Sequence, residues 1–333
     1  MEFKVRACRF NPETDEKPYY KEYTAEDYPG MTVLNALIKI KSELDGTLSF
    51  RRSCRSAICG SCAMKINGIT KLACKTQVSH EIDKFGIINV EPLANMPVIR
   101  DLVVDQESFF DKIKEIKPYL LGQREDEAHN RFHALKEGEK ISQPVYYKSE
   151  FQNLTGNEDT PNCILCECCY SECGGVVGNK NYLGPAALAK LYRYSEDPRD
   201  NDKNGSRLVN GSKSAGMFDC VHCQACEEFC PKGISPVKVI VRMHEKAIKN
   251  SITFSKGAKH IIGIARSIQE TGRLDEIKVA VDSVGISGIL NDLPVAIGAG
   301  LKGKMPPLRL KLIKDMEDIR VAFKDLNLEE KHD

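Results

Sequence analysis

The sequence predicts an α+β fold, with a strand-rich N-terminal part followed by a longer helical part. Apolar residues among charged neighbours predict strands at 1–10 and 19–24, joined across an Asn-Pro-Glu-Thr-Asp turn. A second hairpin is predicted at Asn67-Gly68, a dipeptide typical of two-residue turns. Further along the chain, apolar residues recur at three- and four-residue spacing, which predicts helices.

The composition is that of a folded chain with two or three domains. The chain has 333 residues, of which 41% are hydrophobic and 29% charged, and the net charge is +1. A charge so close to neutral gives no electrostatic basis for binding nucleic acid. The most apolar stretch, 284–301, is interrupted by Asn291, Asp292 and Pro294, so no membrane-spanning helix is predicted. The N-terminus has no apolar segment typical of a signal peptide.

Cysteine is the unusual feature, because thirteen of the fourteen cysteines fall in three dense clusters. In the first cluster Cys54, Cys59 and Cys62 have the spacing C-x4-C-x2-C, and Cys74 follows after eleven residues. This is the spacing of plant-type [2Fe–2S] proteins. Two hairpins, a helix after the N-cap Thr32 and this cysteine loop predict a β-grasp ferredoxin domain at about 1–105.

The other two cysteine runs predict a pair of cubane-type clusters. Residues 220–231 read C-x2-C-x2-C-x3-C-P, the bacterial iron–sulfur run, in which the fourth cysteine binds the neighbouring cluster. Applied to both runs, this rule gives one [4Fe–4S] site with the ligands Cys163, Cys166, Cys169 and Cys230. It gives a second site with the ligands Cys173, Cys220, Cys223 and Cys226. A small helical two-cluster domain is therefore expected at about 106–250.

The cysteine-rich runs have two alternative interpretations, structural zinc and disulfides. Structural zinc suits CxxC pairs but rarely needs runs of three and four cysteines with a terminal proline. Disulfides are not expected in a chain without an export signal. Cys168 is left over and is expected to be buried, and Cys8 is expected to be a core thiol. His222 is expected to face solvent, although it lies between ligands and could tune a cluster.

The remaining segments predict helices and a cysteine-free tail. Helices are expected at the following positions: 109–120, 184–200, from 236 onward, 258–271 and from 308 onward. The polar stretch 122–160 is expected to be loop with short helices. The tail, 251–333, is too apolar at 284–301 to be a disordered extension.

Four stretches of the chain resemble a known family. These stretches are FRRSCRSAICGSCAMKING, CILCECC, GPAALAKLYRYSEDPRD and CPKGISP. They are similar to signature stretches of the iron–sulfur subunit of succinate dehydrogenase and fumarate reductase, over about residues 1–245. The resemblance implies that electrons leave a flavin on a separate FAD subunit. They then pass singly through the clusters, in chain order, toward a quinone site.

The chain departs from the family pattern in three places. The usual member has a small or apolar residue at the position of Cys223 and a [3Fe–4S] third cluster, so this thiol predicts a second [4Fe–4S] cluster instead. Gly174, Val221 and the absence of tryptophan put the ordinary quinone site in doubt. The tail is similar to the C-terminal part of the small iron–sulfur subunit of heterodisulfide reductases, which docks a partner with CCG domains. This combination resembles the methylmenaquinol:fumarate reductases.

The expected function is therefore that of an electron-transfer subunit with no substrate site of its own. It would serve a flavoprotein and a CCG-domain or membrane-anchor subunit, with indirect access to the quinone pool. It is expected at the periphery of a membrane, on the cytoplasmic face or, by export with a signal-bearing partner, on the periplasmic face. The alternatives are a heterodisulfide-reductase-like or glycolate-oxidase-like carrier for another flavoprotein, and a redox-inactive zinc scaffold.

Overall fold

The computed structural model describes most of the chain, in two compact units. The described residues are 2–121, 159–197, 200, 202, 205–291, 293–304 and 311–329. One unit is Met1–Gly211 with Ala215–Met243, and the other is Ser212–Ser214 with His244–Asp333. Most of the loop expected at 122–160 lies outside the described residues.

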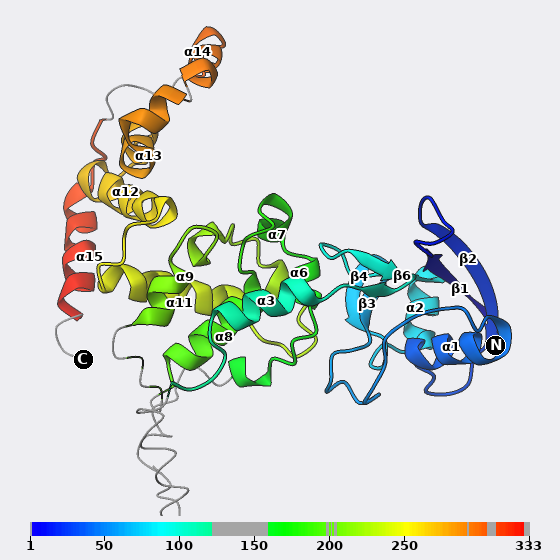
Figure 1. The fold of residues 1–333 in the computed structure, drawn as a ribbon. Coiled ribbons are helices and arrows are strands. Elements are labelled where there is room, and N and C mark those ends of the chain that lie inside the picture. The colour runs from blue at the N-terminus through cyan, green and yellow to red at the C-terminus, as the bar shows by residue number, and fades with distance from the viewer. Residues whose placement is uncertain are drawn as a thin grey trace, which may run out of the picture. The chain divides into compact units, whose positions relative to one another are not determined.

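The N-terminal part of the first unit is built on a five-stranded sheet with the order β2-β1-β5-β3-β4. Figure 1 shows this part of the chain in blue to cyan. Its strands are β1 (Glu2–Arg9), β2 (Tyr19–Glu26), β3 (Ala63–Ile66), β4 (Ile69–Leu72) and β5 (Ile88–Glu91). The two predicted hairpins are β1–β2 and β3–β4, both antiparallel. Strand β5 was not predicted, yet it joins them, because it pairs in parallel with β1 and antiparallel with β3.

Helix α1 (Val33–Lys39) packs its apolar side into the core of this domain. Its N-cap is Thr32, as predicted, and the cap is reciprocal with Asn35. The helix continues as a single π-helical turn, η1 (Ile40–Leu44), which leads toward the first cysteine loop. The remaining elements of this part were not predicted: α2 (Val78–Phe85), β6 (Val98–Arg100) and β7 (Val103–Val104).

The rest of the first unit is helical, with short elements at the cysteine runs. These elements are α3 (Glu107–Glu115), η2 (Thr160–Asn162), α6 (Cys168–Ser171), α7 (Gly174–Gly178), α8 (Pro185–Ser195), α9 (Ser206–Gly211), η3 (Met217–Asp219), α10 (Ala225–Glu228) and α11 (Pro236–Lys249). Helices α3, α8 and α11 correspond to predicted helices, and the boundary between the two units falls inside α11. The rings of Phe109 in α3 and Tyr170 in α6 meet edge to face at 5.4 Å. This contact packs α3 against a cysteine run.

The second unit contains the helices α12 (Lys256–Thr271), α13 (Glu276–Asn291), α14 (Leu293–Leu301) and α15 (Met316–Glu329). Helix α12 was predicted, and it contacts both α13 and α15. Helix α13 is broken at Gly285, whose φ of 71° is not helical. The final helix begins at Met316, later than the predicted start at 308. Within the described part of the chain, no helix is both long enough and apolar enough to cross a bilayer.

Candidate iron–sulfur centres

The first group of thiols lies at the end of the sheet next to the β3–β4 hairpin. Cys54, Cys59 and Cys62 are on the loop before β3, and Cys74 follows β4. Pairing of β3 with β4 therefore returns the fourth cysteine to the loop that holds the other three. The main-chain N–H of Ala57 donates to the Cys74 Sγ at 3.3 Å and joins the loop to the end of the hairpin.

Main-chain donors surround the sulfur atoms of this loop. The Cys54 Sγ accepts hydrogen bonds from the N–H groups of Ser56, Ile58 and Cys59, at 3.3, 3.4 and 3.2 Å. Burial raises the pKa of the Cys59 thiol, but hydrogen bonds from Ser61 and Cys54 outweigh it and lower the pKa to about 6. Convergent N–H donors stabilise negatively charged sulfur, so this loop fits a cluster held by thiolates.

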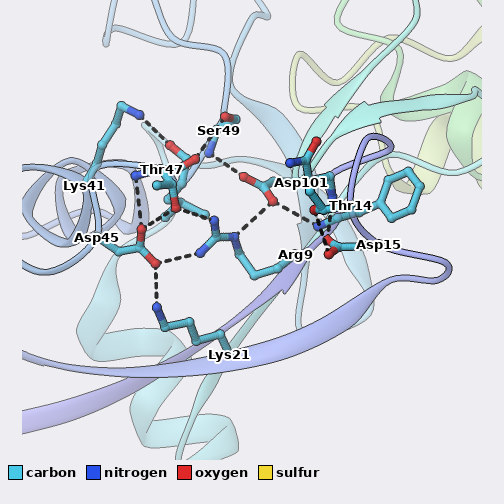
Figure 2. Close-up of polar contacts among 12 residues, drawn as sticks. Arg9, Thr14, Asp15, Lys21, Lys41, Asp45, Thr47, Ser49 and Asp101 are labelled. Carbon is cyan, nitrogen blue, oxygen red and sulfur yellow. Dashed lines mark hydrogen bonds and ion pairs between the residues drawn. The ribbon is translucent and has the colours of Figure 1, made fainter.

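A buried polar network fixes the chain that leads into this loop (Figure 2). The Arg9 guanidinium donates to Asp101 at 3.0 Å and to Asp45 at 2.7 Å. Asp101 also accepts the N–H of Ser49 at 2.8 Å, five residues before Cys54. The charged side chains of Arg9, Asp45 and Asp101 are at most 7% exposed. The first turn of the cysteine loop is therefore tied to the end of β1.

The second group combines cysteines from both later runs in one place. Cys163, Cys166, Cys169 and Cys230 line one cavity, although Cys230 is 61 residues beyond Cys169 in the sequence. The N–H of Ile234 donates to the Cys230 Sγ at 3.3 Å. Burial, followed by repulsion from the neighbouring thiols, raises the pKa of Cys169 well above its usual range. Such buried, mutually repelling thiols fit a metal cluster that removes their protons.

The third group is built like the second. Burial raises the pKa of Cys226 to about 12, with further repulsion from the three other thiols of its group. Its partners in this interaction are Cys220, Cys173 and Cys223. The residues on either side of Cys223 have positive φ, as do the residues on either side of Cys166. A one-turn helix then follows in each run, α6 or α10.

The three thiol groups are neighbours in succession. A Cβ added at Gly60, in the first loop, would lie 2.9 Å from the Cα of Cys166 in the second group. The thiol of Cys226, in the third group, is close enough to Cys169 in the second to contribute to its raised pKa. The second group thus lies next to both of the others.

The structure also places residues that sequence reasoning did not single out. Glu167, between two cysteines, is 1% exposed, and its Oε2 accepts a 2.8 Å hydrogen bond from Gln106. Its Oε1 is buried and accepts no hydrogen bond from the described residues. Burial raises the pKa of Glu167. Tyr182 is 1% exposed and interacts with Cys220, and burial raises its pKa. Both residues were missed because neither belongs to the cysteine spacing.

The remaining cysteine and histidine predictions concern side chains outside the three groups. Cys168 is fully buried, Cys8 lies in the core on β1, and His222 is exposed. No disulfide joins any of the fourteen cysteines, all of which lie within the described residues. Among the described residues, no three His, Cys, Asp or Glu side chains converge closely enough to hold a single metal ion.

Comparisons with known proteins identify both cluster-binding parts. Residues 4–111 match the model of the 2Fe-2S iron-sulfur cluster binding domain, and residues 159–234 match the 4Fe-4S dicluster domain. A chain of the Mycobacterium smegmatis Sdh1 complex in the apo form shares the fold with a TM-score of 0.60 and 24% identity. That match covers 75% of this chain and 97% of the other.

Two relatives are similar to this chain over most of their own length. The fumarate reductase iron-sulfur subunit of Haemophilus influenzae is 38% identical over 71% of this chain and 89% of its own. The 8-methylmenaquinol:fumarate reductase iron-sulfur subunit of Wolinella succinogenes is 33% identical over 91% of this chain and 93% of its own.

The fold and the sites together define an iron–sulfur electron-transfer protein with a plant-type [2Fe–2S] domain and a two-cluster [4Fe–4S] domain. The chain belongs to the family of iron–sulfur subunits of fumarate reductase and succinate dehydrogenase, and it transfers electrons within an oxidoreductase complex. The family assignment favours this function over the heterodisulfide-reductase-like or glycolate-oxidase-like alternative.

Proposed function

We propose that this chain passes single electrons between an FAD-carrying flavoprotein subunit and a quinone-linked subunit. The observation that carries the proposal is the succession of three neighbouring thiol groups, each with four cysteines. Bound iron–sulfur clusters supply one-electron chemistry, while a flavin on another subunit supplies the hydride chemistry. The residues of this chain hold the thiols in line, supply N–H donors to sulfur and exclude water from the buried groups.

The proposed ligand sets follow the three groups. The [2Fe–2S] ligands are Cys54, Cys59, Cys62 and Cys74. The ligands of the first [4Fe–4S] cluster are Cys163, Cys166, Cys169 and Cys230. The ligands of the third cluster are Cys173, Cys220, Cys223 and Cys226. The corresponding domains are 1–105 and 106–250, with an extension at 251–333.

We propose that the third cluster is [4Fe–4S] because Cys223 can act as its fourth ligand. Cys223 lies between two residues of positive φ, and so does Cys166, which lines the cavity of the second group. Its thiol interacts with those of Cys173 and Cys226. Without this thiol, three ligands would remain, which suits a [3Fe–4S] cluster.

Iron and sulfide analysis with electron paramagnetic resonance (EPR) tests the third cluster. The anaerobically purified protein is expected to carry about ten irons, the sum of the three cluster types. Cys223→Ser is expected to lose about one iron and to gain a [3Fe–4S] signal. Cys168→Ser is the matched control, because Cys168 is not in any of the proposed ligand sets, and it should keep the native signals. A native [3Fe–4S] signal would contradict the role of Cys223.

The tail and the partners belong to the same proposal. The Wolinella succinogenes relative is matched over 91% of this chain, whereas the Haemophilus influenzae relative is matched over 71%. This difference supports a complex of the methylmenaquinol:fumarate reductase type, in which 251–333 docks a CCG-domain or membrane-anchor subunit. The chain would then lie at the periphery of a membrane, on the cytoplasmic face or, by export with a partner, on the periplasmic face.

Activity of the purified complex tests the function as a whole. With its flavoprotein and quinone-linked subunits, the complex is expected to reduce fumarate with a quinol or to oxidise succinate with a quinone. Removal of this subunit should leave the flavoprotein able to react with soluble dyes but not with quinones. A complex that carries all three clusters but neither reduces fumarate nor oxidises succinate would overturn the proposal.

A further inference from the structure

Helix α8 packs against the cavity lined by the second thiol group. Ala186 and Ala189 face this cavity, together with Cys163, Cys166, Cys169 and Cys230. The side chains of these two alanines are small, so the helix backbone approaches the sulfur atoms closely. The next residue along the helix, Lys190, is half-buried rather than fully exposed.

The ammonium group of Lys190 is held at the edge of this cavity. Its Nζ donates to the main-chain carbonyl oxygen of Cys163 at 3.2 Å. A lysine side chain has four flexible carbons and usually extends its charge into water. Here the hydrogen bond keeps the positive charge beside the main chain of a proposed ligand.

Two charged side chains line the cavity itself, and neither places a half-buried positive charge beside Cys163. Glu167 is buried and is hydrogen-bonded to Gln106. Lys232 is exposed, beside Pro231. Burial raises the pKa of the Cys163 thiol, and the charge of Lys190 acts in the opposite direction. Lys190 is therefore the half-buried cation that acts on this thiol.

We propose that Lys190 raises the reduction potential of the [4Fe–4S] cluster held by Cys163, Cys166, Cys169 and Cys230. Reduction adds one electron and therefore one negative charge to the site. A fixed positive charge nearby favours the reduced state over the oxidised state, and net charge is one of the factors that set cluster potentials. The inference rests on the proposed ligand assignment, and it makes Lys190 a tuning residue for the second step of electron transfer.

The test is a potentiometric titration, followed by EPR, of the assembled complex. Lys190→Met removes the charge and keeps the length of the side chain. The equilibrium constant for reduction of this cluster is expected to fall on the order of tenfold. For a one-electron couple this lowers the reduction potential by about 59 mV. The other two clusters serve as internal references and should keep their potentials. Titration in the Cys223→Ser background separates the two [4Fe–4S] signals.

Three further variants separate charge from other effects. Lys190→Arg retains the charge and should retain most of the potential. Lys190→Gln keeps a hydrogen-bond donor without the charge and should behave like Lys190→Met; it also replaces that variant if the methionine prevents cluster assembly. Lys17→Met removes the same charge from an exposed loop and should change nothing.

The inference is overturned if Lys190→Gln and Lys190→Met leave the potential of this cluster unchanged. It is also overturned if all three potentials shift together or if Lys17→Met has the same effect. Failure of the proposed function is a different result, in which the complex carries all three clusters but neither reduces fumarate nor oxidises succinate. Failure of the ligand assignment is distinct again, because a [4Fe–4S] signal would then survive Cys163→Ser unchanged.

Discussion

At the scale of single residues, Gly60 lies between the first and second thiol groups. Its φ is +75°, a conformation that costs a residue with a Cβ about 1–3 kcal/mol. The added Cβ would also lie 2.9 Å from both the Cα and the Cβ of Cys166. Only glycine lets the two cysteine loops come this close, and close approach of the clusters is what electron transfer requires.

Substitution at this residue should therefore separate the loops. Gly60→Ala is expected to lower the free energy of unfolding by about 2–6 kcal/mol, the sum of backbone strain and steric contact. The change should also weaken the magnetic coupling between the [2Fe–2S] cluster and its neighbour in EPR spectra. Gly68→Ala is the matched control: its φ is +78°, but nothing lies within 4 Å of the added Cβ. Equal effects of the two substitutions would show that contact with Cys166 is unimportant.

At the scale of elements, the Arg9 network ties together segments that are distant in the sequence. Arg9 ends β1, Asp45 follows η1, Tyr23 is in β2, and Asp101 lies in the turn between β6 and β7. The Arg9 side chain bonds all three of these partners. A buried ion pair of this kind is costly to break, because removal of one partner leaves the other charge uncompensated.

The acid stability of the domain should reflect this network. Hydrogen bonds from Lys21 and Thr47, with others from Tyr23 and Arg9, hold the pKa of Asp45 well below its usual range. A lowered folded-state pKa contributes stability above the unfolded pKa of about 3.9, and this stability is lost as the pH falls toward the folded pKa. Asp45→Asn is therefore expected to cost roughly 3–5 kcal/mol at pH 7. The difference in the free energy of unfolding between this variant and wild type should persist at pH 5 and shrink below about pH 4.

Guanidinium denaturation at several pH values measures this difference. Both proteins carry the same acid-labile clusters, so the difference between them isolates the carboxylate. Asp111→Asn removes an exposed carboxylate paired with Lys114 and should have a small effect at every pH. If Asp45→Asn lowered the free energy of unfolding by the same amount at pH 7 and at pH 3, the charge of the Asp45 carboxylate would be ruled out as the cause.

At the scale of the whole molecule, the chain combines a cluster-holding unit with a unit that has exposed apolar side chains. In α13 and α14 the described apolar side chains Leu290, Leu293, Ile297 and Leu301 are 46–86% exposed. Helix α14 consists of apolar residues with one proline and two glycines. Exposed apolar surface of this kind is typical of interaction sites, in agreement with the proposed docking role of 251–333.

Polar substitutions in this unit should therefore affect assembly and leave the clusters intact. The double variant Leu293→Gln and Ile297→Gln is expected to reduce co-purification of the partner subunits at least tenfold, with unchanged iron content. Glu317→Gln, an exposed change in α15, is the control. Undiminished co-purification of the partners with the double variant would exclude this surface as the docking site.

The sequence by itself determined the class of cofactor and the family, because cysteine spacing is a local property that cluster geometry imposes on the chain. It also gave the hairpins and the capped helix after Thr32, which depend on short-range turn and cap chemistry. Strand β5 was missed because only its pairing with two distant strands makes it a strand. The approach of Gly60 to Cys166 and the position of Lys190 over Cys163 were decided only by the tertiary structure. Each of these contacts joins residues that are distant in the sequence, and a local sequence pattern does not show that such residues are close in space.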